Sequence, residues 1–277
     1  GRVGPSVGLL LNEDKSEIVT DDDSIVAEIQ SVLPRVQHVP REVVLLGAPV
    51  GNETSVNTVL HSKLVDFRRL ASRLITLNAH DALFLLKNCF GLPKLLYTLR
   101  CAASYKSSVL QEYDGVIQHT LKVLLNVDLT DDVWRQATLP VSSGGLGVRL
   151  ATDLALPAFL SSVNGAADLT MKLLPSRLHE VSGDRDPVCV AACLEWQTRS
   201  ASTVPDPAKS GIQKAWDLPV VSRKREELLS AAQTQVGRAR LIAAAAPHSS
   251  DFLHTVPCSS IGTRLDDMSL RIAIGLR

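Results

Sequence analysis

The stretch "TSVNTVLHSKLVDFRRLASRLITL", residues 54–77, decides the fold class of this 277-residue chain. Apolar side chains recur in it every three or four positions, which is the spacing of a helix with one buried face. The apolar positions are Val56, Leu60, Leu64, Phe67, Leu70, Leu74 and Leu77. We therefore predict a long amphipathic helix here, and the same spacing further along predicts a mostly α-helical protein.

Helical patterns follow one another after residue 77. Asn78 is a predicted N-cap, Gly91 a predicted helix end and Pro93 a predicted helix start. Helices are predicted at residues 79–90, 93–104, 108–126, 130–139, 152–163, 222–246 and 266–277. Polar stretches rich in Pro, Ser, Asp and Gly, at residues 176–188 and 200–211, predict loops.

The N-terminal residues have a different pattern. "GLLLNEDKSEIVT", residues 8–20, predicts two strands around a polar turn, and "DDDSIVAEIQSVLP", residues 21–34, predicts a short helix with an acidic start. Val43–Leu46 then predict a buried strand that enters a tight turn with two glycines and a proline. We predict a small α+β part at residues 1–53 and two helical parts at 54–127 and 128–277.

Positive charge is concentrated in one segment of a chain whose net charge is zero. Residues 54–110 contain eight Lys or Arg and two Asp or Glu, a net charge of +6. Such a segment suggests contact with a polyanion, although a solvated helix face explains the same charges equally well. The candidate side chains are Arg68, Arg69, Arg73, Lys87, Lys94 and Arg100.

The five cysteines are irregularly spaced, which does not indicate a disulfide framework and favours an intracellular protein, nuclear or cytoplasmic. No apolar run approaches the roughly 18 residues of a membrane span, so no membrane contact is expected. Cys189 and Cys193 are one helical turn apart and could share a metal with His179, but two thiols in a core explain them better.

Two further motifs suggest ligands but have simpler explanations. "SSGGLGVR", residues 142–149, lacks the Lys-Ser/Thr of a nucleotide-binding loop, so we predict a structural turn. Asp21, Asp22 and Asp23 could bind Mg²⁺, but acidic residues at a helix start also stabilise the helix dipole, and we prefer that interpretation. The histidines are scattered and suggest no catalytic constellation.

Two motifs near the N-terminus resemble a known family. The segment "GLLLNEDKSE", residues 8–17, is followed by Leu46-Gly47-Ala48-Pro49-Val50-Gly51. Together, in this order and at this separation, they resemble the segments after the catalytic aspartates in reverse transcriptases of LINE-type (non-long-terminal-repeat) retrotransposons. The matching residues of the first motif are Gly8, Leu9, Leu11, Asn12, Lys15, Ser16 and Glu17.

The resemblance extends over nearly the whole chain and is firmest at residues 8–160. Residues 80–100, 134–162 and 255–277 resemble successively later segments of these polymerases. The resemblance implies a palm remnant with a primer-grip strand and turn at 1–53, a helical thumb at 54–127 and a helical connector at 128–277.

The resemblance also implies roles for individual residues. Lys15 would lie near the incoming triphosphate as an auxiliary catalytic residue. The nucleic-acid-binding residues would be Leu46, Gly47, Ala48, Pro49 and Gly51 in the primer grip, and Arg68, Arg69, Arg73, Lys94 and Arg100 in the thumb. Their partner would be an RNA–DNA template–primer duplex, bound mainly through its phosphates.

One departure from the family limits the expected activity. Nucleotidyl transfer uses Mg²⁺ held by carboxylates, which this family places in an early strand and in a Tyr/Phe-Ala-Asp-Asp hairpin. No such tetrapeptide occurs here. We therefore expect the C-terminal part of a polymerase that lacks its fingers and most of its palm, with no cofactor of its own and no activity alone. The alternative is a domesticated or degenerate helical protein, without catalysis, that binds nucleic acid or protein.

Overall fold

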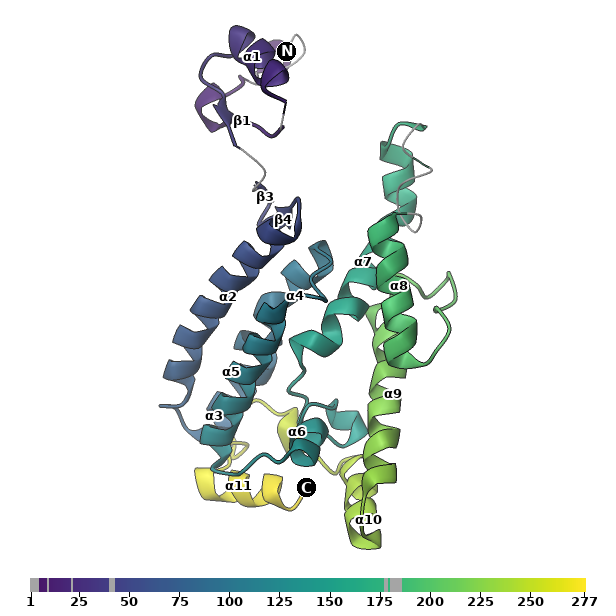
Figure 1. Cartoon of the computed structure of the whole chain (residues 1–277). Helices are drawn as coiled ribbons and strands as arrows, with labels where there is room; N and C mark the ends of the chain where they lie inside the picture. Colours follow the sequence, from purple (N-terminus) through teal and green to yellow (C-terminus); the bar gives the residue numbers. More distant parts are fainter. Residues whose placement is uncertain (1–4, 9, 21, 40–42, 177–178, 180–185) are drawn as a thin grey trace. The chain divides into compact units, whose positions relative to one another are not determined.

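The computed structural model describes residues 5–8, 10–20, 22–39, 43–176, 179 and 186–277. It is 64% helix and 4% strand, which confirms the predicted mostly α-helical fold. The chain divides into two compact units, Gly1–Val59 and Leu60–Arg277 (Figure 1). Helix α2, Glu53–Leu74, begins in the first unit and continues into the second.

The first unit is built from short elements around a small core. Strand β1, Glu17–Ile18, pairs in parallel with β2, Gln37–His38, and helix α1, Asp23–Val32, connects them. The core contains Ile18, Val26 and Val36, with Ile29 and Leu33 packed against it. Strands β3, Val43–Leu45, and β4, Ala48–Val50, form a separate antiparallel hairpin. The first of the two strands predicted within residues 8–20 is wrong, because Leu10 and Leu11 are exposed and unpaired with any described strand.

The second unit contains helices and loops, and no strand among its described residues. After α2 come α3, Ala79–Leu85, a π-helical turn, Leu86–Phe90, α4, Leu92–Cys101, α5, Ser108–Leu125, α6, Asp131–Ala137, and α7, Ala151–Leu173. The remaining helices are α8, Pro187–Ser200, α9, Gln213–Ala231, α10, Gln235–Ala244, and α11, Asp267–Gly275. The single helix predicted at 222–246 is therefore wrong. Thr234 starts a new helix there, since its side chain accepts a hydrogen bond from the Gly237 N–H.

Helix α2 packs on α5 through a narrow apolar stripe. Its buried residues are Leu60, Leu64, Phe67, Ala71 and Leu74. The Phe67 ring stacks on Tyr113 of α5 with 4.4 Å between ring centroids. The Tyr113 hydroxyl donates to the Gly91 carbonyl at 2.9 Å and so links the pair to the start of α4. Leu77, predicted on the same face, is exposed because α2 ends at Leu74.

The glycine-rich loop before α7 is a close-packed turn, as predicted. Gly144 has φ +93°, and a side chain at Gly145 would place its Cβ 2.1 Å from the Leu139 carbonyl oxygen. Helix α7 then begins under the carboxylate of Asp114, which accepts hydrogen bonds from Ala151 N, Thr152 N and Thr152 Oγ1. The close approach at Gly145 therefore requires a glycine for packing.

Candidate nucleic-acid interface

The β3–β4 hairpin turns through two residues, Leu46 and Gly47, between the paired residues Leu45 and Ala48. Their φ angles are +51° and +82°, and positive φ at both central positions defines a type I′ turn. Glycine adopts this conformation readily, whereas a leucine in it is strained. The Leu46 side chain is 88% exposed. The turn therefore holds an apolar side chain in solvent at the hairpin tip.

The rest of this motif is arranged differently from the prediction. The buried strand was predicted at Val43–Leu46, but β3 ends at Leu45, and Val44, Leu45 and Leu46 are exposed. Pro49 lies in β4, opposite Val44, rather than in the turn, and it is buried. Ala48 is half-buried, and Gly51 follows the strand with φ +125°.

Lys15 ends a short 3₁₀ turn, Glu13–Lys15, in the first unit. Its side chain is exposed, and its backbone N–H donates to the Asn12 carbonyl. The two acidic residues of the turn pair with Arg35, at 3.6 Å from Glu13 and 3.3 Å from Asp14. Arg35 thus compensates these carboxylates and leaves the lysine exposed beside them.

The acidic start of α1 caps the helix. The Asp22 carboxylate accepts hydrogen bonds from the Ser24 N–H and hydroxyl, which hold its pKa below the ordinary value. Asp21 lies outside the described residues. In the described part of the chain, no group of three or more His, Cys, Asp and Glu is placed to hold a metal.

The candidate cysteine site forms no ligand group among the residues that the structure describes. Cys189 is buried and Cys193 half-buried on α8. His179 Nε2 lies 2.9 Å from the Leu174 carbonyl oxygen. These positions agree with thiols that pack within the helical unit.

Three arginines predicted to contact phosphates are exposed on α2. Arg68 pairs with Glu112 of α5 at 2.9 Å, and Arg69 pairs with Asp66 at 3.1 Å. Arg73 has no ion pair among the described residues. Exposed ion pairs contribute little stability, so a phosphate can replace the carboxylate at small cost. This surface of α2 is therefore suited to bind a polyanion.

The other basic candidates are dispersed over the second unit. Lys94 and Arg100 are exposed on α4, and Arg100 donates to the Gln213 side-chain oxygen at 3.0 Å. Lys87 was also predicted at the surface, but its ammonium donates to the Leu253 carbonyl at 2.7 Å. Burial, together with nearby Arg277, lowers the Lys87 pKa. Lys87 therefore stabilises the packing of the fold and is not proposed to contact phosphate.

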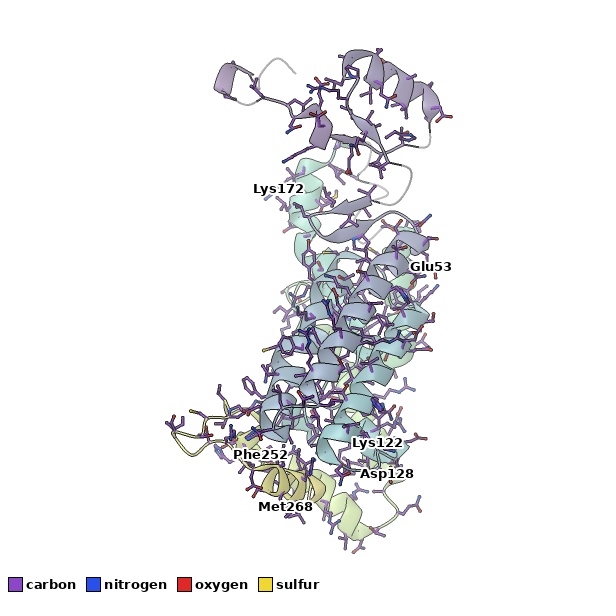
Figure 2. The ribbon with its side chains drawn as sticks, turned by 90° about the vertical axis from the view of Figure 1, so that its left-hand side faces the viewer. Glu53, Lys122, Asp128, Lys172, Phe252 and Met268 are labelled. Carbon is purple, nitrogen blue, oxygen red and sulfur yellow. The ribbon has the colours of Figure 1, made fainter. Side chains whose placement is uncertain are left out.

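A groove between α2 and α5 was not predicted from the sequence. It has a volume of about 450 Å³ and an apolar floor that includes Ala71, Ile75 and Val116. Arg68 and Glu112 line it as well, so their ion pair crosses from one helix to the other. Further along α5, Lys122 pairs with Asp128 at 2.7 Å (Figure 2). The available signal for the groove was Gly115, a glycine in the middle of a predicted helix.

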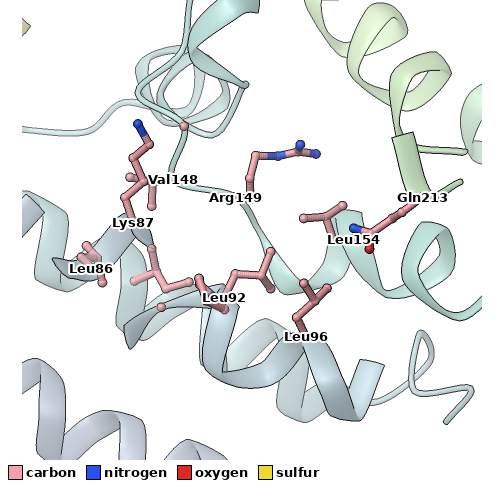
Figure 3. A pocket seen from close by; sticks show the side chains of 12 residues that line it. Leu86, Lys87, Leu92, Leu96, Val148, Arg149, Leu154 and Gln213 are labelled. Atoms are coloured by element: carbon pink, nitrogen blue, oxygen red, sulfur yellow. The ribbon is translucent and has the colours of Figure 1, made fainter. Parts of the chain in front are cut away.

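A second, smaller pocket lies between α4 and the loop that leads to α7 (Figure 3). Its volume is about 130 Å³, and Leu86, Leu92 and Leu154 are among its lining residues. The head group of Arg149 at its margin binds Asp217 through two contacts of 2.7 Å. Lys87 lines the pocket as well, so both of its basic residues already bind a carbonyl or a carboxylate.

Comparisons with protein-family models, with curated proteins and with solved structures found no match for this chain. Within the described ranges, none of the helices combines the length and the apolar character needed to cross a membrane.

Proposed function

We propose that this chain is the C-terminal part of a LINE-type reverse transcriptase, and that it positions the primer and binds the template–primer duplex. The observation that carries the proposal is a succession along the chain. A hairpin with an exposed tip at Leu46 and Gly47 is followed directly by α2, whose exposed side carries Arg68, Arg69 and Arg73. The ordered sequence motifs described above support the same assignment.

The hairpin supplies what a primer grip requires. A primer 3′ end must be held in register, because small displacements of reacting atoms reduce the rate steeply. Gly47 has no side chain, so the backbone can approach a sugar–phosphate chain closely. Leu46 extends from the tip and offers an apolar contact to a sugar or a base edge. The two-residue turn fixes both positions relative to β3 and β4.

The arginines of α2 supply sequence-independent affinity. Guanidinium groups bind phosphate oxygens with two parallel hydrogen bonds, and the release of counterions makes such binding weaken with salt. In this proposal Arg68 and Arg69 exchange their carboxylate partners for phosphates, while Arg73 binds without such an exchange. Lys94 and Arg100 on α4 supply further phosphate contacts.

Lys15 faces the triphosphate in this proposal, where its ammonium neutralises charge on the leaving pyrophosphate. The carboxylates that hold Mg²⁺ belong to the parent polymerase outside these residues. This chain alone is proposed to bind nucleic acid without extending a primer.

Fluorescence anisotropy with a labelled RNA–DNA hybrid, titrated with the purified chain across a salt series, tests the proposal. We expect binding that weakens linearly with the logarithm of the salt concentration, because phosphate contacts dominate. A folded chain, verified by circular dichroism, that fails to bind the hybrid at low salt would contradict the proposal. The family resemblance would then record ancestry only.

A further inference from the structure

A polar pocket lies apart from α2, between the glycine-rich loop, α9 and the end of α10. Its volume is about 290 Å³. The lining residues are Ser142, Ser143, Ser222, Arg225, Glu226 and Ala245. Three hydroxyl groups and one guanidinium therefore face the same small space, which is near the lower limit for a ligand site.

The donors in this pocket are not used by the described parts of the chain. Arg223 binds Glu227 and two backbone carbonyls, and Lys224 binds Asp153 and Thr138. Arg225, on the same helix and half-buried, has no hydrogen bond or ion pair with any described residue. The same holds for the side-chain hydroxyls of the three serines. None of its side-chain nitrogens is among the buried atoms that lack a partner, so the guanidinium is accessible to an acceptor from outside the chain.

A second arginine, Arg277, binds backbone carbonyls next to the pocket. The guanidinium of Arg277 donates to the carbonyls of Val141, Gly145 and Ala244, which flank the lining residues Ser142 and Ala245. Its Nε and Nη1 atoms are buried and have no partner in the described residues. No described carboxylate pairs with Arg277, which does not itself line the pocket, and Arg225 carries the positive charge among the lining residues. The opposing charge at the pocket is Glu226, which is exposed.

We infer that this pocket binds a phosphate group, with Arg225 as the bidentate donor and the serine hydroxyls as additional donors. Arginine matches the geometry of phosphate oxygens, and hydroxyl groups complete such sites. Glu226 lies beside the bound oxygens, where it weakens a bare dianion and can accept a hydrogen bond from a hydroxyl of a phosphate ester. The inference does not depend on the proposed function, because none of these residues lies on α2 or in the hairpin.

Isothermal titration calorimetry of the full chain at constant ionic strength tests the inference, with inorganic phosphate and adenosine 5′-monophosphate as probes in chloride buffer. We expect saturable binding that R225A weakens at least about tenfold, because charge-assisted hydrogen bonds are lost. E226Q is expected to tighten inorganic phosphate by about threefold, because it removes a nearby negative charge. Tighter binding of the nucleotide assigns the site to phosphate esters, and equal binding assigns it to free phosphate.

R238A is the matched control, since Arg238 is exposed on α10 and does not line the pocket. Thermal unfolding without phosphate verifies that each variant is folded. If R225A does not fold, the R225K variant replaces it in the titrations. Absence of saturable binding by the wild-type chain would overturn the inference. It would also be overturned if R225A, or a folded R225K, bound phosphate as tightly as R238A does.

Discussion

The guanidinium of Arg68 on α2 lies 2.9 Å from the carboxylate of Glu112 on α5, and each side chain is 50% exposed. The pair crosses the groove between the two helices. An exposed pair of this kind contributes at most about 1 kcal/mol to stability. Its main consequence is that Glu112 competes with any phosphate for Arg68.

Replacing Glu112 by Gln is therefore predicted to strengthen hybrid binding. The substitution releases Arg68 and removes one negative charge, so the salt dependence should steepen by up to about one unit of slope. Anisotropy titrations at several salt concentrations measure both quantities. An unchanged affinity and slope would show that Arg68 is not at the binding surface.

Replacing Leu46 by Gly is predicted to stabilise the hairpin and to weaken hybrid binding. Glycine relieves the positive-φ strain, which should stabilise the hairpin by about 1 kcal/mol. The same change removes the exposed side chain proposed to contact the primer, so hybrid affinity should fall. Amide hydrogen exchange in residues 43–50 reports the first effect and anisotropy the second. Stabilisation without any loss of affinity would exclude a role for the Leu46 side chain.

Two glycine substitutions are predicted to have opposite effects on stability. Gly115 lies within α5 and has open space around an added Cβ, so G115A should stabilise the protein by about 0.5–1 kcal/mol. At Gly145 the added Cβ would lie 2.1 Å from the Leu139 carbonyl oxygen, so G145A should destabilise it. Urea unfolding of both variants measures the difference, and a stable G145A variant would contradict the packing of the loop.

The buried carboxyl of Asp114 is predicted to make stability depend on pH. Burial raises its pKa to about 6 from the ordinary value of 3.8, against hydrogen bonds from Thr152 and Ala151 that lower it. Between these values the unfolded chain loses this proton before the folded chain does. Stability from Asp114 is therefore fully present below about pH 4 and decreases as pH rises to 6, by about 3 kcal/mol.

The D114N variant isolates this contribution because it removes the titrating group. We expect the free energy of unfolding of the wild type to decrease, relative to that of D114N, as the pH rises from 4.5 to 7. A difference that stays constant, or that grows in favour of the wild type as pH rises, would contradict the raised pKa of Asp114.

Local patterns predicted much of the helical architecture. The spacing of Leu60, Leu64, Phe67 and Leu74 gave the buried face of α2, and Gly91 ends the turn before α4 as expected. Gly91 is required there because an added Cβ would lie 2.6 Å from the Leu86 carbonyl oxygen. Asp22 caps α1, as its position before an apolar pattern indicated.

Features that depend on distant or unfavourable residues could not be predicted. The sequence predicted Lys87 at the surface. It is half-buried because it contacts Leu253, which lies far along the chain. The type I′ turn was not predicted from the sequence because leucine rarely adopts a positive φ. The break after α9 carries no Pro or Gly, so the alanine-rich sequence around it predicted a continuous helix.

The most direct test of the central claim compares two charge-matched triple variants in hybrid binding. R68A/R69A/R73A removes the exposed arginines of α2, and K209A/K214A/R238A removes three exposed basic residues elsewhere in the second unit. We predict that the first variant loses most of its affinity and salt dependence, while the second retains both. Equal losses in the two variants would show that binding follows net charge alone, and the thumb assignment of α2 would be wrong.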